Sequence, residues 1–114
     1  MNIKQQNGAV IIELKGKLVG GPLAGRMDRT LDNILAQGKK QIIVDLSSVT
    51  HLDSSGMGIL LSGFTKVNYE GGKLKLANIT AKIRNLLSIT KLNSIFEVYD
   101  SVDEAIKSFN HQKI

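Results

Sequence analysis

The run Asp53-Ser54-Ser55-Gly56 holds the side chains of this sequence whose types and spacing could do chemistry. It follows the apolar stretch 42–46 and begins a segment whose apolar residues have helical spacing. Asp and Ser are both favoured at helix N-caps, so capping is the simplest role for Ser54. A phosphate on its hydroxyl would instead meet free backbone N–H groups and the positive end of the helix dipole. Ser54 is therefore interpreted as a helix cap or a phosphoacceptor, with Asp53 and Ser55 as its environment.

The helix predicted from Ser54 towards Tyr69 carries unusually small residues on one side. Glycine inside a helix costs about 1 kcal/mol relative to alanine, so these residues need a reason. Either they pack against the protein's own sheet or a neighbouring helix, or they form a smooth surface that a partner can approach closely. We predict a docking face with Ile59 as its exposed aliphatic side chain, although Met57 also fits the core stripe. The predicted face consists of Gly56, Met57, Gly58, Ile59, Ser62 and Gly63.

Length and composition indicate one domain spanning 1–114, with a frayed tail from about residue 110. The chain has no cysteine, which excludes disulfides, thiolate catalysis and zinc–cysteine or iron–sulfur sites. No apolar run approaches the roughly 20 residues of a membrane span, and the N-terminus lacks a signal-peptide pattern. We therefore expect a cytoplasmic protein without membrane insertion.

The formal net charge of +5 raises the question of nucleic-acid binding. The basic residues are spread along the chain without a dense cluster, and few aromatic residues could stack on bases. Phe64 and Phe109 lie on helix faces that resemble core. A solvated basic surface is the better interpretation, and no nucleic-acid partner is expected.

The order of predicted elements is β-β-α-β-α-β-α-β-α, which indicates an α/β fold with a mixed, mostly parallel sheet of four to five strands and about four helices. Asn7-Gly8 predicts an N-terminal hairpin. The continuous apolar run 42–44 predicts a central strand covered on both faces. Strands are expected at 2–6, 9–14, 41–46, 73–77 and 95–99, a loop at 16–21, and helices starting near Pro22, Ser54, Thr80 and Ser101.

Two other classes of function besides a switch are conceivable for this sequence. An enzyme would need a base, a nucleophile and an orienting group, but only His51 and His111 are available and no such set is evident. We expect no enzyme activity, catalytic residue, cofactor or metal site. A receiver-like domain phosphorylated on aspartate could use Asp45 at a strand end, but the first strand lacks the acidic pair that would bind magnesium.

Three segments carry a family resemblance. Residues 43–49 (Ile-Val-Asp-Leu-Ser-Ser-Val) lead through 52–58 (Leu-Asp-Ser-Ser-Gly-Met-Gly) into the helix, and the Gly-Gly-Lys-Leu of 71–74 follows. Together they resemble the STAS domain of bacterial anti-sigma-factor antagonists, over nearly the whole chain. Two segments depart from the family pattern: 16–21 replaces a common Gly-Glu-Leu-Asp-like segment, and 90–92 replaces a common Ser-Gly-Leu.

The resemblance implies that Ser54 is the phosphoacceptor. It implies that the unphosphorylated chain binds a serine-kinase anti-sigma factor, which phosphorylates Ser54 with ATP and so switches binding off, and that a PP2C-type phosphatase resets the switch. The chain would then be a substrate and binder. The alternative is a STAS module that is never phosphorylated and acts as an adaptor of a transporter or another signalling complex, with Ser54 as a cap.

Overall fold

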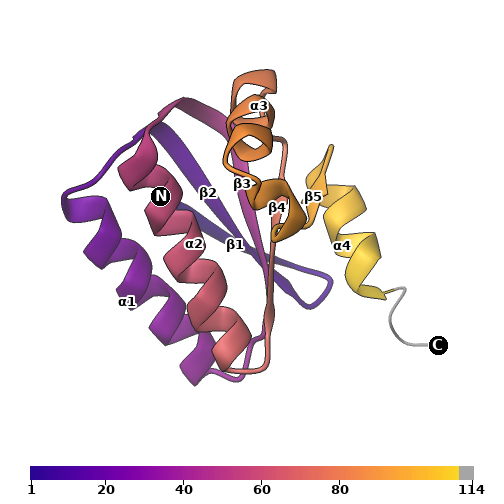
Figure 1. Cartoon of the computed structure of the whole chain (residues 1–114). Helices are drawn as coiled ribbons and strands as arrows, with labels where there is room; N and C mark the ends of the chain where they lie inside the picture. Colours follow the sequence, from indigo (N-terminus) through magenta and orange to yellow (C-terminus); the bar gives the residue numbers. More distant parts are fainter. Residues whose placement is uncertain (111–114) are drawn as a thin grey trace.

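The fold is built on a five-stranded sheet in the order β1-β2-β3-β4-β5 (Figure 1). The computed structural model describes residues 1–110. β1 is antiparallel to β2, and the other neighbouring strands are parallel. The α/β fold with a mixed sheet is therefore confirmed. The elements are β1 (Asn2–Gln6), β2 (Ala9–Leu18), α1 (Pro22–Ala36), β3 (Gln41–Leu52), α2 (Ser54–Tyr69), β4 (Lys73–Ala77), α3 (Ala81–Ile89), the 3₁₀ turn η1 (Leu92–Ser94), β5 (Val98–Tyr99) and α4 (Val102–Asn110).

Local sequence signals set several element boundaries as predicted. Asn7 and Gly8 both have positive φ, 52° and 84°, as the tight turn of a two-residue hairpin requires. Pro22 is the first residue of α1, where its missing N–H costs nothing. Gly38 follows the end of α1 with φ 78°, and the Thr80 hydroxyl caps α3 by accepting a hydrogen bond from the Ile83 N–H at 3.2 Å.

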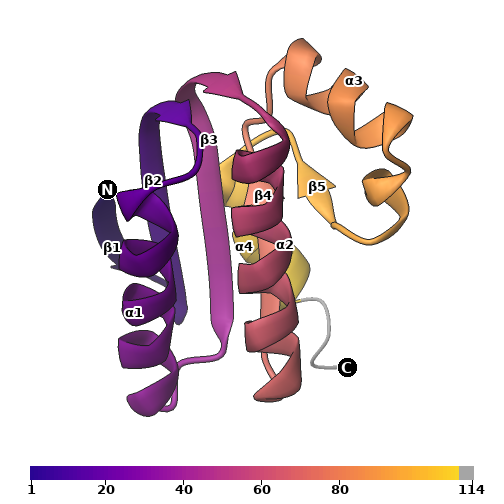
Figure 2. The same cartoon turned by 60° about the vertical axis from the view of Figure 1, so that its left-hand side comes forward.

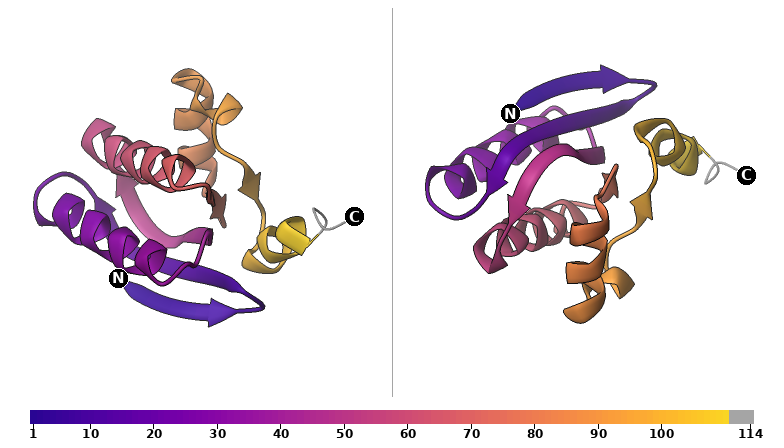
Figure 3. Two further views of the ribbon diagram at one scale, coloured as in Figure 1. Left: turned by 90° about the horizontal axis from the view of Figure 1, so that it is seen from below. Right: turned by 90° about the horizontal axis from the view of Figure 1, so that it is seen from above.

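The helices cover the two faces of the sheet unequally. α1 and α2 lie side by side on one face, and α4 packs on the other (Figures 2 and 3). α3 lies near the C-terminal ends of the parallel strands and adds Ile83 and Leu87 to the core on the α1–α2 side. The central strand β3 is buried from Ile42 to Leu46, as its continuous apolar run predicted. None of the helices in residues 1–110 is both long and apolar enough to cross a membrane.

Three strands differ in length from the prediction. β2 runs on to Leu18, so the expected loop at 16–21 is reduced to three residues, and β3 runs on to Leu52. These extensions have no continuous apolar run, although Leu18 and Val49 are buried, and they form because the two strands pair with each other. β5 is only Val98–Tyr99, because residues 95–97 form a turn and bend that follow η1. Asn110 ends α4, and the rest of the tail that was expected to fray lies outside the described residues.

A buried lysine joins α4 to the sheet, which the sequence pattern did not indicate. Lys75 on β4 is 1% exposed. Its Nζ donates a hydrogen bond to Ser108 Oγ at 2.7 Å and lies 4.1 Å from the centre of the Phe109 ring. Glu97 supplies a countercharge at 3.4 Å. The ammonium group is thus hydrogen-bonded and paired, as a buried charge must be.

Candidate functional site

At the start of α2, the Asp53 side chain caps the helix and the Ser54 side chain does not. Asp53 is the N-cap of α2, and its Oδ1 accepts a hydrogen bond from the Gly56 N–H at 2.8 Å. Ser54 is the first helical residue, and its side chain is exposed. Within residues 1–110 no hydrogen bond from the Ser54 hydroxyl to another protein group is present. Capping is therefore the role of Asp53, and the Ser54 hydroxyl is left open to solvent.

A two-stranded extension of the sheet carries this helix start. β4 ends at Ala77, opposite Asp45, so the last seven residues of β3 pair with β2 alone. Leu18 and Leu52 are the last partners of that pair. The Leu18 carbonyl oxygen also accepts a 3.5 Å hydrogen bond from the Asp53 N–H. The end of β2 therefore positions the first turn of α2.

Gly56 allows this contact between β2 and α2. A Cβ atom at Gly56 would lie 1.8 Å from the Leu18 carbonyl oxygen, far inside any allowed separation. The loop after β2 is also close, because a Cβ at Gly20 would lie 3.3 Å from Ser55 Cβ. The loop after β2 therefore lies beside Ser55, although Ser54 and Ser55 are both exposed.

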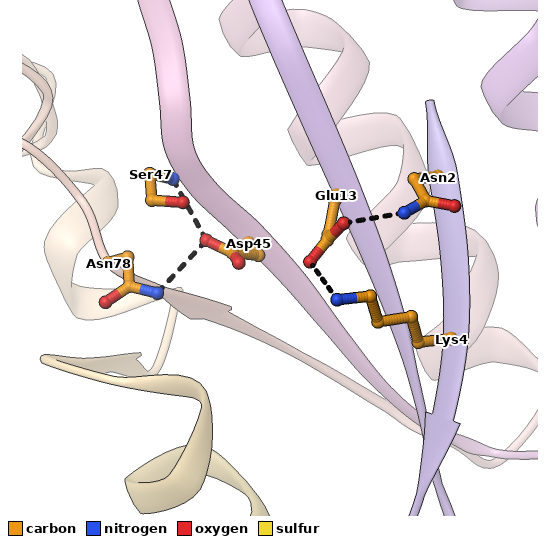
Figure 4. Close-up of polar contacts among 6 residues, drawn as sticks. All are labelled: Asn2, Lys4, Glu13, Asp45, Ser47 and Asn78. Carbon is orange, nitrogen blue, oxygen red and sulfur yellow. Dashed lines mark hydrogen bonds and ion pairs between the residues drawn. The ribbon is translucent and has the colours of Figure 1, made fainter.

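A bulge bends β3 at the root of the extension, and Asp45 stabilises it. The register advances by one extra β3 residue between the pairs Glu13–Asp45 and Lys15–Ser48. Asp45 Oδ1 accepts hydrogen bonds from the Ser47 N–H at 3.0 Å and from Asn78 Nδ2 at 3.1 Å (Figure 4). Asp45 as a whole residue is 8% exposed. This aspartate, considered above as a receiver-type phosphoacceptor, is buried and engaged in holding the bulge.

Glu13 lies beside Asp45 on β2, and its partners come from the edge strand (Figure 4). Lys4 forms an ion pair with it at 3.1 Å, and Asn2 Nδ2 donates a hydrogen bond at 2.9 Å. The hydrogen bonds from Lys4 and Asn2 hold the pKa of Glu13 below its usual value. This cluster fastens β1 to β2 and lies on the sheet face of Ile43, which packs against α4.

The six residues predicted as a docking face fall on two sides of α2. Met57 and Ile59 are only 6% and 7% exposed, so the expectation of an exposed Ile59 is wrong. Gly56 and Gly63 are buried as well. A Cβ at Gly63 would lie 3.0 Å from Leu31 Cδ1, because α1 and α2 approach each other closely there. Only Gly58 and Ser62 of the six are exposed, so the interpretation that the glycines pack within the protein holds for Gly56 and Gly63.

The exposed side of α2 borders two hollows. A pocket of about 320 Å³ lies between the start of α1 and α2, and it is lined by Gly20, Ala24, Met27, Asp28, Leu31, Ser55, Gly58, Ile59, Ser62 and Gly63. A wider groove of about 970 Å³ continues along α2 and shares Gly58 and Ser62 with the pocket. A Cβ at Gly58 would meet no atom within 4 Å. The absence of a side chain there is therefore not explained by packing within the protein.

His51 contributes to a different hollow. Together with Thr80 and Lys82 it lines a pocket of about 210 Å³ between the end of β3 and α3. Within residues 1–110, no three His, Asp or Glu side chains gather in a way that could hold a metal ion. Sequence reasoning missed the roles of Leu18 and Gly20 beside the helix start, and the three glycines between positions 16 and 21 were the one signal of a close approach.

Comparison with known proteins identifies the class. Residues 1–105 match the family model of the STAS domain. The chain therefore belongs to the STAS domain family, as the Asp-Ser-Ser-Gly segment indicated. Its relatives include a candidate anti-sigma factor antagonist of Thermotoga neapolitana, 32% identical over 76 residues that make up 67% of each chain. The anti-sigma F factor antagonist of Paenibacillus polymyxa is 23% identical over 93% of this chain and 91% of that protein.

Solved structures agree with this placement. The crystal structure of a candidate anti-sigma factor antagonist from Thermotoga maritima has a TM-score of 0.83 and 25% identity, over 94% of this chain and 92% of that one. The phosphorylated form of SpoIIAA, a Bacillus cell fate determinant, has a TM-score of 0.72 at 20% identity, over 95% and 97% of the two chains. The latter likeness is one of fold.

Proposed function

We propose that this chain is an anti-sigma-factor antagonist whose partner binding is switched off by phosphorylation of Ser54. In its unphosphorylated form it binds a serine-kinase anti-sigma factor in the cytoplasm. That kinase transfers the terminal phosphoryl group of ATP to the Ser54 hydroxyl, with loss of the hydroxyl proton and release of ADP. A PP2C-type phosphatase hydrolyses the phosphoserine and restores binding. In this role the chain is a substrate and a binder.

The observation that carries the proposal is that Asp53, and not Ser54, caps α2. Asp53 caps the helix, so the exposed Ser54 hydroxyl can be modified without removing the cap. The first helical N–H groups lie next to it, and the helix dipole favours a negative group there. Phosphorylation would therefore leave the fold intact.

The effect on a partner follows from charge. A phosphate adds about −2 at neutral pH, beside the carboxylate of Asp53. Gly58 and Ser62 lie further along the exposed side of the same helix, next to the pocket that contains Ser55. A partner that covers this surface would have to desolvate the phosphate. Such a local change in charge can act as an association switch.

The test is phosphorylation by the serine-kinase anti-sigma factors encoded in the same genome, with radiolabelled ATP. We expect label in the wild-type chain and in Ser55→Ala, and none in Ser54→Ala. Calorimetry should then show a loss of affinity of at least about tenfold, roughly 1.4 kcal/mol, for the phosphorylated chain. Label in Ser54→Ala equal to wild type, or unchanged affinity after phosphorylation, would contradict the proposal. Recovery of a transporter and no kinase in affinity capture would support the constitutive adaptor instead.

A further inference from the structure

The outer edge of β1 is an open edge of the sheet. β1 is the first strand in the sheet order, all five of its residues are exposed, and within residues 1–110 no other strand pairs with its outer side (Figure 3). Natural proteins protect such edges with proline, a bulge or an unpaired charge. β1 has no proline and pairs with β2 in a continuous register. Its one charged residue, Lys4, is neutralised by Glu13 on the α4 face of the sheet.

The backbone groups of alternate β1 residues face outward from the sheet. The two-residue turn of the hairpin makes the flanking residues, Gln6 and Ala9, a hydrogen-bonded pair. Alternation along an antiparallel ladder then directs the N–H and C=O groups of Ile3 and Gln5 away from β2. An extended segment laid against β1 would therefore find donors and acceptors in the pattern of a sheet.

β1 is held in position by contacts within the protein. Lys4 and Asn2 bind the Glu13 carboxylate from β1, at 3.1 Å and 2.9 Å. Met1 packs against the core, and its Sδ accepts a hydrogen bond from Thr30 Oγ1 at 3.5 Å. A strand that is already ordered lowers the entropic cost of binding to its edge.

Two neighbouring hollows lie between this edge and α1. One of about 360 Å³ is lined by Met1, Ile3, Arg26, Arg29, Thr30 and Asn33. The other, of about 220 Å³, shares three of these residues and adds Gln5, Gln37 and Lys39 among others. No acidic residue lines either hollow, and neither shares a residue with the pocket that contains Ser55. A partner at this edge would therefore leave the start of α2 free.

Three cations that are separated in the sequence gather at these hollows. Arg26 and Arg29 are exposed and three residues apart on α1, so they lie on the same side of the helix, and Lys39 follows the end of α1. Within residues 1–110 none of the three forms an ion pair. The two carboxylates of α1 are both bound by Lys66 on the α2 side. The surface beside β1 is therefore basic and without a countercharge.

We propose that β1 binds an acidic segment of a partner protein, which adds to the five-stranded sheet as a sixth strand. Its backbone pairs with Ile3 and Gln5, and its acidic side chains, on alternate residues, face Arg26, Arg29 and Lys39. Charge selects this occupant. A second copy of β1 would bring two sets of the same cations together, whereas carboxylates complement them.

The test is binding of a fluorescent ten-residue peptide in which glutamate alternates with threonine, measured by anisotropy. We expect a Kd of about 10–100 µM at low ionic strength, weakened by added salt. The same peptide with lysine in place of glutamate should bind at least about tenfold more weakly. N-Methylation of alternate peptide N–H groups keeps every carboxylate. It should abolish binding for one of the two alternate sets, because only one set faces β1.

Two sets of variants separate the charge from the strand edge. The double variant Arg26→Glu, Arg29→Glu should lose at least about tenfold in affinity. Its matched control, Lys82→Glu with Lys107→Glu, makes the same change in net charge at exposed helix positions and should stay close to wild type. Gln5→Pro removes an outward N–H and keeps the pairing with β2, so it should also lose about tenfold. Gln5→Ala keeps that N–H and should bind normally.

Four results would overturn the proposal, once circular dichroism shows that the variants are folded. They are no binding at about 1 mM peptide, a range that includes weak association, or undiminished binding by either Arg26→Glu, Arg29→Glu or Gln5→Pro. Equally tight binding of single-stranded DNA that is lost with the arginines would show a general anion surface. A dimer of the chain alone that Gln5→Pro abolishes would show that the occupant is a second copy. No kinase is used, so these outcomes are separate from phosphorylation of Ser54.

Discussion

The inner and outer sides of α2 use glycine for opposite reasons. Gly56 faces the end of β2, where a Cβ would lie 1.8 Å from the Leu18 carbonyl oxygen. Gly58 is two residues further on, and a Cβ there would meet nothing within 4 Å. The first glycine is required by the fold that presents Ser54. The second weakens the helix without any return in packing, which points to a role in contact with a partner.

The largest expected effect is the loss of stability caused by a substitution at Gly56, on the inner side of α2. Gly56→Ala forces α2 away from the Leu18 backbone, which cannot move without disrupting the end of β2. We expect a loss of about 3 kcal/mol in the free energy of unfolding, at the upper end of overpacking effects. Urea denaturation measures it.

Gly63→Ala is the matched control on the same side of the helix. Its Cβ would meet Leu31 Cδ1 at 3.0 Å, the end of a flexible side chain that can shift. The loss should be clearly smaller than for Gly56→Ala. Equal losses at the two positions would show that Leu18 does not make Gly56 special.

The next effect concerns the cap that leaves Ser54 free. Asp53→Ala removes the hydrogen bond accepted from the Gly56 N–H, and we expect a loss of about 1 kcal/mol in the free energy of unfolding. Asp53→Asn should retain most of that stability, because asparagine caps about as well as aspartate. If Asp53→Ala were neutral and Ser54→Ala destabilising, the serine would be the functional cap and our assignment would be wrong.

On the outer side of α2, replacing glycine by alanine should increase the free energy of unfolding instead of lowering it. Gly58→Ala fills open space and improves helix propensity, so we expect stability to rise by up to about 1 kcal/mol. Gly58→Lys should likewise leave the fold intact but abolish binding of the kinase partner, because a long charged side chain blocks close approach. Unchanged partner binding by a folded Gly58→Lys protein would remove Gly58 from the docking surface.

The smallest expected effect lies away from α2, at the Glu13 cluster. The pKa of Glu13 is lowered by hydrogen bonds from Lys4 and Asn2, so its stabilising effect is present above its usual value of 4.5 and is lost as the pH falls through the folded value. We expect Glu13→Gln to melt below the wild-type Tm at pH 7 and to match it at strongly acidic pH, about 3 or less. A difference in Tm that does not depend on pH would contradict this.

Local chemistry explains what the sequence predicted correctly. Asn7-Gly8, Pro22 and Thr80 act through their own backbone or their immediate neighbours, so each marks its element wherever the chain goes. The extensions of β2 to Leu18 and of β3 to Leu52 have no continuous apolar run, and they form because the two strands pair across bulges. Their existence depends on a register that is set elsewhere in the sheet.

In the candidate site too, the sequence predicted the features that depend on local chemistry and missed those that depend on tertiary contacts. Asp53 and Ser54 were both recognisable from their types and spacing, because helix starts have strong local preferences. Gly56 and Gly58 are identical in sequence terms, and only the position of the Leu18 backbone distinguishes the buried one from the exposed one. Ile59 was misassigned for a related reason, since α1 covers a wider stripe of α2 than the apolar spacing alone indicated.

The central claim is that Ser54 is the regulated residue, and its phosphorylation state in the cell tests that claim most directly. The measurement is mass spectrometry with site mapping on the protein purified from its own cells under several growth conditions. We predict phosphate on Ser54, with an occupancy that changes between conditions, and none on Ser55. Phosphate confined to Ser55, or no phosphate under any condition in which the protein is expressed, would contradict the account.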